Sequence, residues 1–241
     1  MKFGKRLKQH VQETLPGWRD MYLNYKGLKK LVRLISSSSE DEFVYLLDNE
    51  LDKFNSFFIE QEEDFIIRHK ELQQRIKRVI ENDPSSQEEY ENEMARIKKD
   101  IVDFHGEMVL LVNYSNINYT GMTKILKKYD KRTGGFLRLP FIQKVLEQPF
   151  FTTELISKLV KECEMIIDEL FPTMVVAEEM AKAVGTEARE GIFRNIVVAL
   201  LTMKEIRQGS STHSHFSLPI LDLRDPELIR SFQLNSTIHI I

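Results

Sequence analysis

Hydrophobic residues recur three and four positions apart along most of the chain, which is the spacing of one face of an α-helix. Short helices are predicted from Lys2 to about Val11 and from Trp18 to Ile35, with a break at Leu15-Pro16-Gly17 between them. A long helix is predicted from Asp41 to about Glu81. No sustained strand-like alternation occurs before the final Ile238–Ile241, so the pattern indicates an all-α fold.

The most regular periodicity follows the turn cluster Asn82–Ser86. Apolar positions there alternate four and three residues apart, as in a coiled-coil seam: Tyr90, Met94, Ile97, Ile101, Phe104, Met108 and Leu111. Two long helices joined by a short turn predict an antiparallel hairpin. The polar segment Asn113–Thr120 predicts a break or kink, after which a separate helix ends at Gly134-Gly135. Shorter helices are predicted over Pro140–Glu147 and Thr152–Phe171.

The character of the sequence changes after Pro172. Two more helices are predicted, over Val175–Val184 and Ile192–Ile206, before the Ser/Thr/His-rich segment Gly209–His215, which we expect to be flexible. We therefore divide the chain into a domain over residues 1–172 and a C-terminal helical extension with a flexible tail over residues 173–241.

Composition indicates the cellular compartment of the protein, whereas net charge says little about its binding partner. The chain has 241 residues, and its 34 basic and 37 acidic side chains give a net charge of only −3, so no global charge favours nucleic acid. Cys163 is the single cysteine, which excludes an internal disulfide and fits the cytoplasm or the nucleus. The charged N-terminus lacks the apolar run of a secretory signal, and the longest apolar run, Ile196–Leu201, is far shorter than a membrane span. We expect a soluble protein.

Positive charge is concentrated in the segment Thr123–Arg132. On a helix that turns by about 100° per residue, its lysines fall within an arc of roughly 100°: Lys124, Lys127, Lys128 and Lys131. The neighbouring apolar residues fall on the opposite arc: Met122, Ile125, Leu126 and Tyr129. Because like charges at this spacing weaken a helix, this lysine stripe indicates binding of a polyanion. The alternatives, from the stripe alone, are a solvated helix face and a nuclear import patch.

Two further basic groups precede the lysine stripe. Tyr25 and Lys29 lie about 40° apart on the second helix, with Lys29 at the edge of the apolar face. The N-terminal helix carries four cations beside its free backbone N–H groups: Lys2, Lys5, Arg6 and Lys8. If the three basic elements converge in space, they form one anion site. The alternatives are a buried aromatic ring with a solvated hydroxyl for Tyr25, and fraying for the N-terminal helix.

Catalytic chemistry finds little support in the sequence. No glycine-rich phosphate loop follows a strand, and the six histidines are scattered. His105 lies in the coiled-coil segment, where a partly buried histidine is expected, and His213 and His215 lack carboxylates or cysteine at metal-ligand spacing. We therefore predict no catalytic residues, no metal site and no enzymatic activity.

The chain resembles an SPX domain over roughly residues 1–172. The resemblance is carried in order by MKFGKRLKQHVQETLPGWRDMYLNYKGLKKLV, ELDKFNSFF, VDFHGEM and NYTGMTKILKKYDKRTGGFLRLPFIQKVLEQPFFT. It is similar to the plant stand-alone SPX proteins, and the later segment NIVVALLTMKEIRQGSST also resembles the C-terminal region of that group. The resemblance implies an N-terminal helical hairpin packed on a bundle of two long antiparallel helices, with shorter C-terminal helices.

The resemblance also implies a function and a site. The ligand would be inositol hexakisphosphate or an inositol pyrophosphate, with no cofactor, and matching motifs assign its binding to Lys2, Tyr25, Lys29, Lys124, Lys127, Lys128 and Lys131. When liganded, the protein would bind and inhibit a MYB coiled-coil transcription factor that controls phosphate-starvation genes, in the nucleus, the cytoplasm or both. Neither direct DNA binding nor a membrane partner is expected, whereas a homodimer is compatible with the sequence. Gly27 lies inside the motif helix and should weaken it by roughly 1 kcal/mol relative to alanine.

Two other functional classes remain open. A structural adaptor would pair through the coiled-coil seam Tyr90–Leu111 and would not depend on the lysines. A binder of nucleic acid or of an anionic membrane would use the lysine stripe but would need stacking aromatics or an apolar face beside it. Tyr129, on the apolar arc, is predicted to face the core instead.

Overall fold

The computed structural model describes residues 3–34, 40–81, 87–170 and 218. Every regular element in these ranges is helical, as the periodicity predicts, and the all-α fold is confirmed there. In chain order the elements are α1 (Phe3–Glu13), the 3₁₀ helix η1 (Pro16–Met21), α2 (Tyr25–Leu34), α3 (Glu40–Glu81), α4 (Gln87–Thr133), α5 (Arg138–Leu146), the 3₁₀ helix η2 (Pro149–Phe151) and α6 (Glu154–Leu170).

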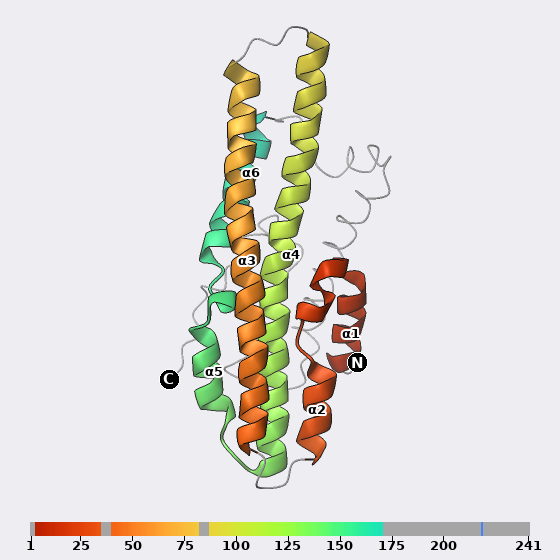
Figure 1. Ribbon diagram of the computed structural model, residues 1–241, viewed down its shortest axis with the longest axis vertical. Coiled ribbons are helices and arrows are strands. Elements are labelled where there is room, and N and C mark those ends of the chain that lie inside the picture. Colours follow the sequence, from red (N-terminus) through yellow and green to blue (C-terminus); the bar gives the residue numbers. More distant parts are fainter. Residues whose placement is uncertain (1–2, 35–39, 82–86, 171–217, 219–241) are drawn as a thin grey trace.

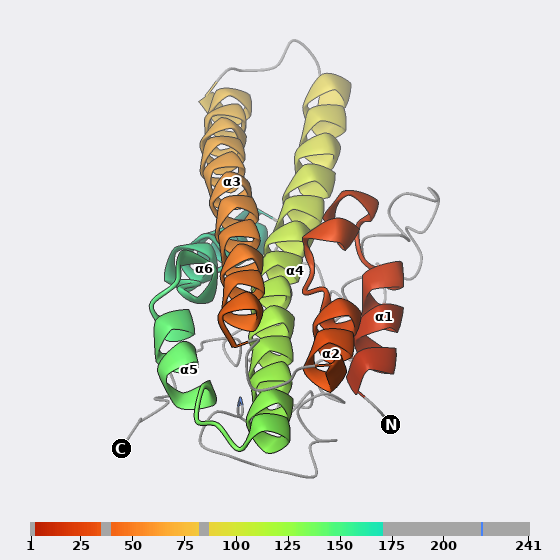
Figure 2. The ribbon, with the colours of Figure 1, turned by 60° about the horizontal axis from the view of Figure 1, so that its bottom comes forward.

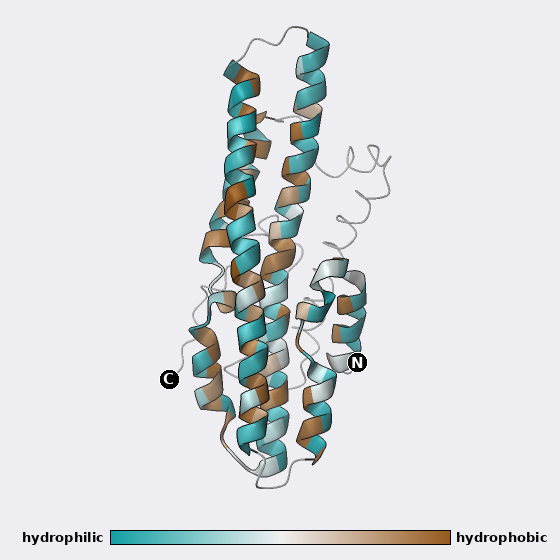
Figure 3. Cartoon of the chain, viewed as in Figure 1, coloured by the Kyte–Doolittle hydropathy of each residue, from teal (hydrophilic) through white to brown (hydrophobic). Residues whose placement is uncertain are grey.

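Two long antiparallel helices, α3 and α4, form the axis of the molecule (Figure 1). With 42 and 47 residues, they extend about 63 and 70 Å at 1.5 Å per residue. The coiled-coil seam is buried from Ile97 to Leu111, and its Phe104 ring meets the Phe65 ring of α3 edge-on, 5.6 Å between centroids. Hydrophilic and hydrophobic residues alternate around both helices (Figure 3), as expected where one face is covered and the other meets water.

The shorter elements cover two sides of this pair. The first three elements, α1, η1 and α2, lie beside α4, whereas α5, η2 and α6 lie on the other side (Figures 1 and 2). The C-terminal part of α4 therefore has the N-terminal hairpin along one side and α5 along another. This arrangement agrees with the N-terminal hairpin on a long-helix bundle that the resemblance implies.

The predicted break at Asn113–Thr120 is wrong, because α4 runs without interruption from Gln87 to Thr133. The polar side chains there do not compete with the helix. Asn116 donates to the Val112 carbonyl (2.9 Å) and Thr120 donates to the Asn116 carbonyl (2.8 Å), so both bond within the helix. Asn118 is fully buried and bonds instead to the N-terminal hairpin, through the backbone N–H of Leu23 (2.9 Å). The segment is a polar contact surface for that hairpin.

The predicted single helix from Trp18 to Ile35 is also wrong in its continuity. Its first part is the 3₁₀ helix η1, and residues 22–24 separate it from α2. Trp18 still lies in the core, where its ring meets Phe57 edge-on at 5.3 Å. The break exists because side chains of α3 and α4 bond the backbone of residues 21–24, which a continuous helix would have bonded internally.

The remaining helices agree with the sequence to within a few residues. Helix α4 ends with Gly134 at φ +74°, in the left-handed region that glycine adopts without strain, as the Gly134-Gly135 pair predicts. Pro140 falls in the first turn of α5, where its missing N–H breaks no helical bond.

Several predictions lie outside the described residues: the turn at 82–86, the helices at 175–184 and 192–206, the flexible segment 209–215, and the division at residue 172. Leu218 is described, and its side chain is buried. Among the described helices, none has the length and apolar character needed to cross a bilayer.

Candidate functional site

Tyr25 opens α2 and lies where α1, α2 and α4 approach one another. Its side chain is buried, and its ring meets the Phe3 ring of α1 edge-on, 4.9 Å between centroids. Gly4 allows this approach, because a Cβ atom there would lie only 3.2 Å from Tyr25 Cδ1. Burial raises the pKa of Tyr25 to about 12, so its hydroxyl stays protonated at neutral pH.

Lys124 extends this cluster from α4. Its Nζ atom lies 5.6 Å from the centre of the Phe3 ring, so Phe3 lies between a buried tyrosine and a half-buried lysine. The pKa of Lys124 is lowered first by burial and then by the positive charges of Lys127, Lys128 and Arg6. The fold thus brings a cation of α1 into the electrostatic field of the lysine stripe.

The orientation of the lysine stripe agrees with the helical-wheel prediction. Lys127 is half-buried, whereas Lys128 and Lys131 are exposed. The four residues of the opposite arc are all buried: Met122, Ile125, Leu126 and Tyr129. Tyr129 stacks on Phe43 of α3 with 4.4 Å between ring centroids and 4° between ring planes, which holds this part of α4 in its rotation about the helix axis.

The lysine stripe is not neutralised within the described part of the chain. No carboxylate there lies within 4.0 Å of Lys29 or of any lysine of the stripe. Cations elsewhere on the bundle have such partners, for example Lys53 with Glu50 at 2.8 Å and Lys144 with Asp48 at 2.7 Å.

Asp130 is the carboxylate nearest to the stripe in the sequence, and the fold uses it elsewhere. Its Oδ1 atom accepts the backbone N–H groups of Leu137 (3.0 Å) and Arg138 (3.3 Å) at the start of α5. Asp130 therefore closes the turn between α4 and α5, and the positive charge of the stripe stays available to an external anion.

The other sequence-predicted site residues differ in how closely they join this cluster. Lys29 lies one turn after Tyr25, half-buried, on a helix that packs against α4. In the described part of the chain, neither Lys29 nor Lys131 makes a hydrogen bond, ion pair or ring contact with Phe3, Tyr25 or Lys124. Lys2 lies outside the described residues.

Phe3 and Arg6 are additions that the motif match did not assign. The sequence carries a signal for both, because Phe3, Leu7 and His10 recur at helical spacing and face the core, which places Arg6 beside Phe3 at the edge of that face. Spacing alone could not show that this edge would lie against the lysine stripe.

Gly27 makes room for the side chain that caps α2, a role that its position inside the motif did not indicate. It is the third residue of α2, and its N–H donates to Oδ1 of Asn24, which caps the helix (3.0 Å). A Cβ atom at Gly27 would come within 2.6 Å of Asn24 Nδ2, so the glycine makes room for the cap.

The described residues hold no group of three or more His, Cys, Asp or Glu side chains placed to bind a metal ion. His105 is half-buried, as expected, with its Nε2 atom 3.4 Å from Glu164 Oε1 of α6. The chemistry that this site offers is therefore ammonium, guanidinium and phenol groups, which suit a multiply charged oxyanion.

Comparison with known proteins gives the same family by sequence and by structure. The SPX domain family matches residues 1–39 and 82–145. SPX domain-containing protein 3 of Arabidopsis thaliana is 59% identical over the whole of both chains, and its namesake in Oryza sativa subsp. japonica is 56% identical over 91% of this chain and 87% of its own. The SPX domain of Chaetomium thermophilum glycerophosphodiester phosphodiesterase 1, solved in complex with inositol hexakisphosphate, matches 70% of this chain and 99% of its own, with 30% identity and a TM-score of 0.52.

Proposed function

The chain belongs to the SPX domain-containing proteins, and from this premise we propose that it is a sensor that binds inositol polyphosphates or pyrophosphates through the lysine stripe and α2. The single observation that carries the proposal is the lysine stripe itself, unneutralised by any described carboxylate and next to the Phe3–Tyr25 contact. The inositol hexakisphosphate complex of the related fungal domain supports this ligand class.

The geometry suits a ligand with several phosphates around a small ring. Each phosphate monoester carries about −1.5 to −2 charges at neutral pH, so one such ligand can neutralise several lysines together. Lys124 and Lys127 would contact it from a half-buried position, and Lys128 and Lys131 from the exposed side. Tyr25, Lys29 and Lys2 would contribute from the N-terminal hairpin, so that the ligand links the hairpin to α4.

The output that we propose is ligand-dependent inhibition of a MYB coiled-coil transcription factor of the phosphate-starvation response. The support is the high identity to plant SPX domain-containing proteins. Because Lys128 and Lys131 are exposed, an anion held there would keep some of its phosphates accessible to basic groups of a partner. The nucleus, the cytoplasm or both remain the predicted location, and absence of enzymatic activity remains a prediction.

The structure disfavours the coiled-coil adaptor. The seam from Ile97 to Leu111 is buried inside this chain, so that it cannot also pair with another protein without unfolding the bundle.

A second candidate, binding to an anionic membrane, is favoured by one observation. Phe136 follows the last turn of α4 and is 89% exposed, with Leu139 also exposed nearby in sequence. An exposed aromatic ring beside a basic helix end provides the apolar contact that membrane binding needs. Co-sedimentation with phosphatidylserine vesicles decides this candidate: binding that is lost in Phe136→Ser would support it, and no binding by the parent protein would exclude it.

Calorimetric titration with inositol hexakisphosphate tests the proposed ligand. The Lys128→Ala/Lys131→Ala variant should bind at least tenfold more weakly than the parent, since each charge-assisted bond contributes about 1.5–3 kcal/mol. The matched control is Lys70→Ala/Lys99→Ala, which removes two exposed lysines elsewhere on α3 and α4 and should bind like the parent. If Lys128→Ala/Lys131→Ala binds inositol hexakisphosphate as tightly as the control variant and the parent do, the site is refuted.

The transcription-factor step is tested by titrating the coiled-coil segment of a MYB partner into the parent protein, with and without inositol hexakisphosphate. We expect tight binding only when the ligand is present. If the MYB segment binds equally well without inositol hexakisphosphate, the two proteins interact but the proposed sensor function is refuted.

A further inference from the structure

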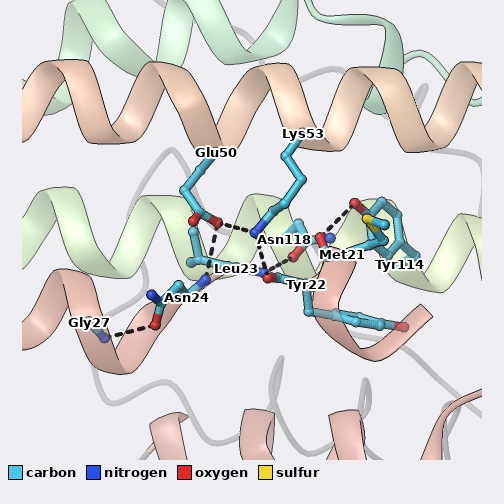
Figure 4. Close-up of polar contacts among 9 residues, drawn as sticks. All are labelled: Met21, Tyr22, Leu23, Asn24, Gly27, Glu50, Lys53, Tyr114 and Asn118. Atoms are coloured by element: carbon cyan, nitrogen blue, oxygen red, sulfur yellow. Dashed lines mark hydrogen bonds and ion pairs between the residues drawn. The ribbon is translucent and has the colours of Figure 1, made fainter. Parts of the chain in front are cut away.

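The segment Met21–Asn24, just before Tyr25, is held by side chains from both long helices (Figure 4). From α4, Tyr114 donates to the Met21 carbonyl (3.0 Å) and Asn118 accepts the Leu23 N–H (2.9 Å). From α3, Lys53 donates to the Tyr22 carbonyl (3.0 Å) and Glu50 accepts the Asn24 N–H (3.1 Å). We refer to these four side chains, Glu50, Lys53, Tyr114 and Asn118, as the hinge clamp.

The hinge clamp leaves little freedom in the chain that leads into α2. The Leu23 carbonyl accepts the Tyr25 N–H (2.7 Å), and the Asn24 carbonyl accepts the Leu28 N–H (3.1 Å). The backbone groups of this segment are therefore bonded both to the long helices and to the start of α2. A surface loop would have bonded the same groups to water. Fixed side-chain partners instead define where α2 begins and in which direction it runs.

The charged half of the hinge clamp is built as one unit. Glu50 Oε2 accepts both the Asn24 N–H and the Lys53 ammonium group, 2.8 Å away, and the two side chains are only 16% and 27% exposed. The carboxylate also lies beside the N-terminus of α2, where the helix dipole favours negative charge. Lys53 is thereby occupied by Glu50 and Tyr22, in contrast to the lysines of the stripe.

Burying Asn118 costs folding free energy that its packing contacts do not explain. Its side chain is fully buried, and its Nδ2 atom has no hydrogen-bond partner among the described residues. A buried polar group left without a partner destabilises the folded state, because it has lost its bonds to water. An amide at this position therefore makes sense through what its Oδ1 atom holds, which is the backbone two residues before Tyr25.

We propose that the hinge clamp, with Asn118 at its centre, positions Tyr25 and Lys29 of α2 against the lysine stripe for ligand binding. This inference rests on the proposed function, because it concerns the same ligand. Asn118 and Glu50 are positioning residues: they act on the ligand through α2 and do not contact it.

The test is a double-mutant cycle with inositol hexakisphosphate in the full chain, using Asn118→Leu and Lys29→Ala. If Asn118 acts through α2, Asn118→Leu should weaken binding about 3- to 10-fold, and Lys29→Ala should cost less in that background than in the parent. A merely structural role would not produce this coupling. Affinity equal to the parent, or fully additive effects, would overturn the proposal.

Two further variants protect the test from misfolding. Glu50→Gln keeps an acceptor for the Asn24 N–H but loses the charge that holds Lys53, and it should show the same coupling to Lys29→Ala if Asn118→Leu fails to fold. The matched control is Asn55→Leu, which breaks a comparable long-range bond on another side of α3, from the Phe150 N–H to Asn55 Oδ1 (3.3 Å), and should bind like the parent.

Hydrogen exchange separates failure of the clamp from failure of the proposed function. Without any ligand, amides of residues 22–28 should exchange at least tenfold faster in Asn118→Leu than in Asn55→Leu. Unchanged exchange would overturn the clamp whatever the ligand does. A parent protein that does not bind inositol hexakisphosphate would instead overturn the proposed function, while the exchange result still decides whether the clamp holds α2.

Discussion

The ammonium group of Lys124 lies 5.6 Å from the centre of the Phe3 ring and joins the start of the first helix to the last third of α4. The contact puts a cation in a half-buried position beside Lys127, Lys128 and Arg6, and the pKa of Lys124 is lowered as a result. A site of this kind carries electrostatic repulsion in the free protein that a bound polyanion relieves. Stability and binding should therefore respond in opposite directions when a charge is removed.

Lys128→Gln tests this opposition. Lys128 faces Lys124 one turn before it and Lys131 one turn after it, and each like-charged pair destabilises a helix by about 0.2–0.5 kcal/mol. We expect the unliganded variant to be more stable by about 0.5 kcal/mol in urea unfolding, and to bind inositol hexakisphosphate more weakly in calorimetry. Lys99→Gln, an exposed lysine elsewhere on α4, is the control and should change neither quantity in this way. A loss of stability in Lys128→Gln would contradict the repulsion.

Salt should separate the same two effects in the parent protein. Raising NaCl from 50 to 500 mM shortens the screening length from about 14 to about 4 Å, which weakens repulsion between exposed lysines and attraction to a ligand alike. We expect the gain from Lys128→Gln in the unliganded protein to disappear at high salt, and the affinity for inositol hexakisphosphate to fall. An affinity independent of salt would indicate that the ligand is not held by these charges.

Helical periodicity was sufficient to predict most of this fold. It predicted α3, the part of α4 before Asn113, the buried seam between them and the buried arc opposite the lysine stripe, because each of these depends only on which face of a helix is apolar. Helix ends that depend on local sequence could also be predicted, as the end of α4 at Gly134 shows.

The errors share one physical cause. Asn113–Thr120 looks like a helix break because asparagine and serine favour turns when they face water. In this protein Asn118 faces the N-terminal hairpin, so its preference is overridden by a contact between residues far apart in the sequence. The same contact, together with the bonds from Glu50 and Lys53 of α3, produces the break at residues 22–24. Long-range bonds of this kind cannot be read from the periodicity of a single sequence. Arg6 was already among the N-terminal cations expected to converge with the stripe, but the contact of Phe3 with Lys124 could not be predicted, for the same reason.

Gly121→Ala should disturb the docking of the N-terminal hairpin. A Cβ atom at this buried position of α4 would lie only 2.5 Å from Leu23 Cδ2 and 3.6 Å from the Phe3 ring. Overpacking of this kind costs about 1–3 kcal/mol, despite the better helix propensity of alanine. Urea unfolding should show the loss, and inositol hexakisphosphate binding should weaken because Leu23 lies in the segment that leads into α2.

Two variants identify the cause of that loss. Gly17→Ala introduces a methyl group where nothing lies within 4 Å, and it should leave both stability and affinity near the parent values. Leu23→Ala in the Gly121→Ala background removes the clashing atoms, and the double variant should lose less stability than the two single losses added together. Additive losses would show that the clash with Leu23 is not the reason.

His10 should make the stability of the hairpin dependent on pH. Its side chain is 2% exposed, with Nε2 lying 3.3 Å from the Tyr22 hydroxyl and 3.4 Å from Asn113 Nδ2 of α4. Burial lowers its pKa from 6.5 to about 4, so the folded protein holds it neutral. As pH falls below 6.5 the unfolded chain takes up this proton first, so stability is lost progressively until pH reaches about 4, where the folded state is protonated as well.

The measurement is urea unfolding between pH 7 and pH 4 for the parent protein and for His10→Gln. A shift of this size corresponds to about 3 kcal/mol of stability lost over that interval in the parent, in addition to the loss from carboxylates that both proteins share. Glutamine keeps a polar group near Tyr22 but does not titrate, so the stability difference between the two proteins should shrink or reverse as pH falls. Parallel stability curves would show that the folded protein does not hold His10 neutral, and that the cluster of His10, Tyr22 and Asn113 tolerates the charge.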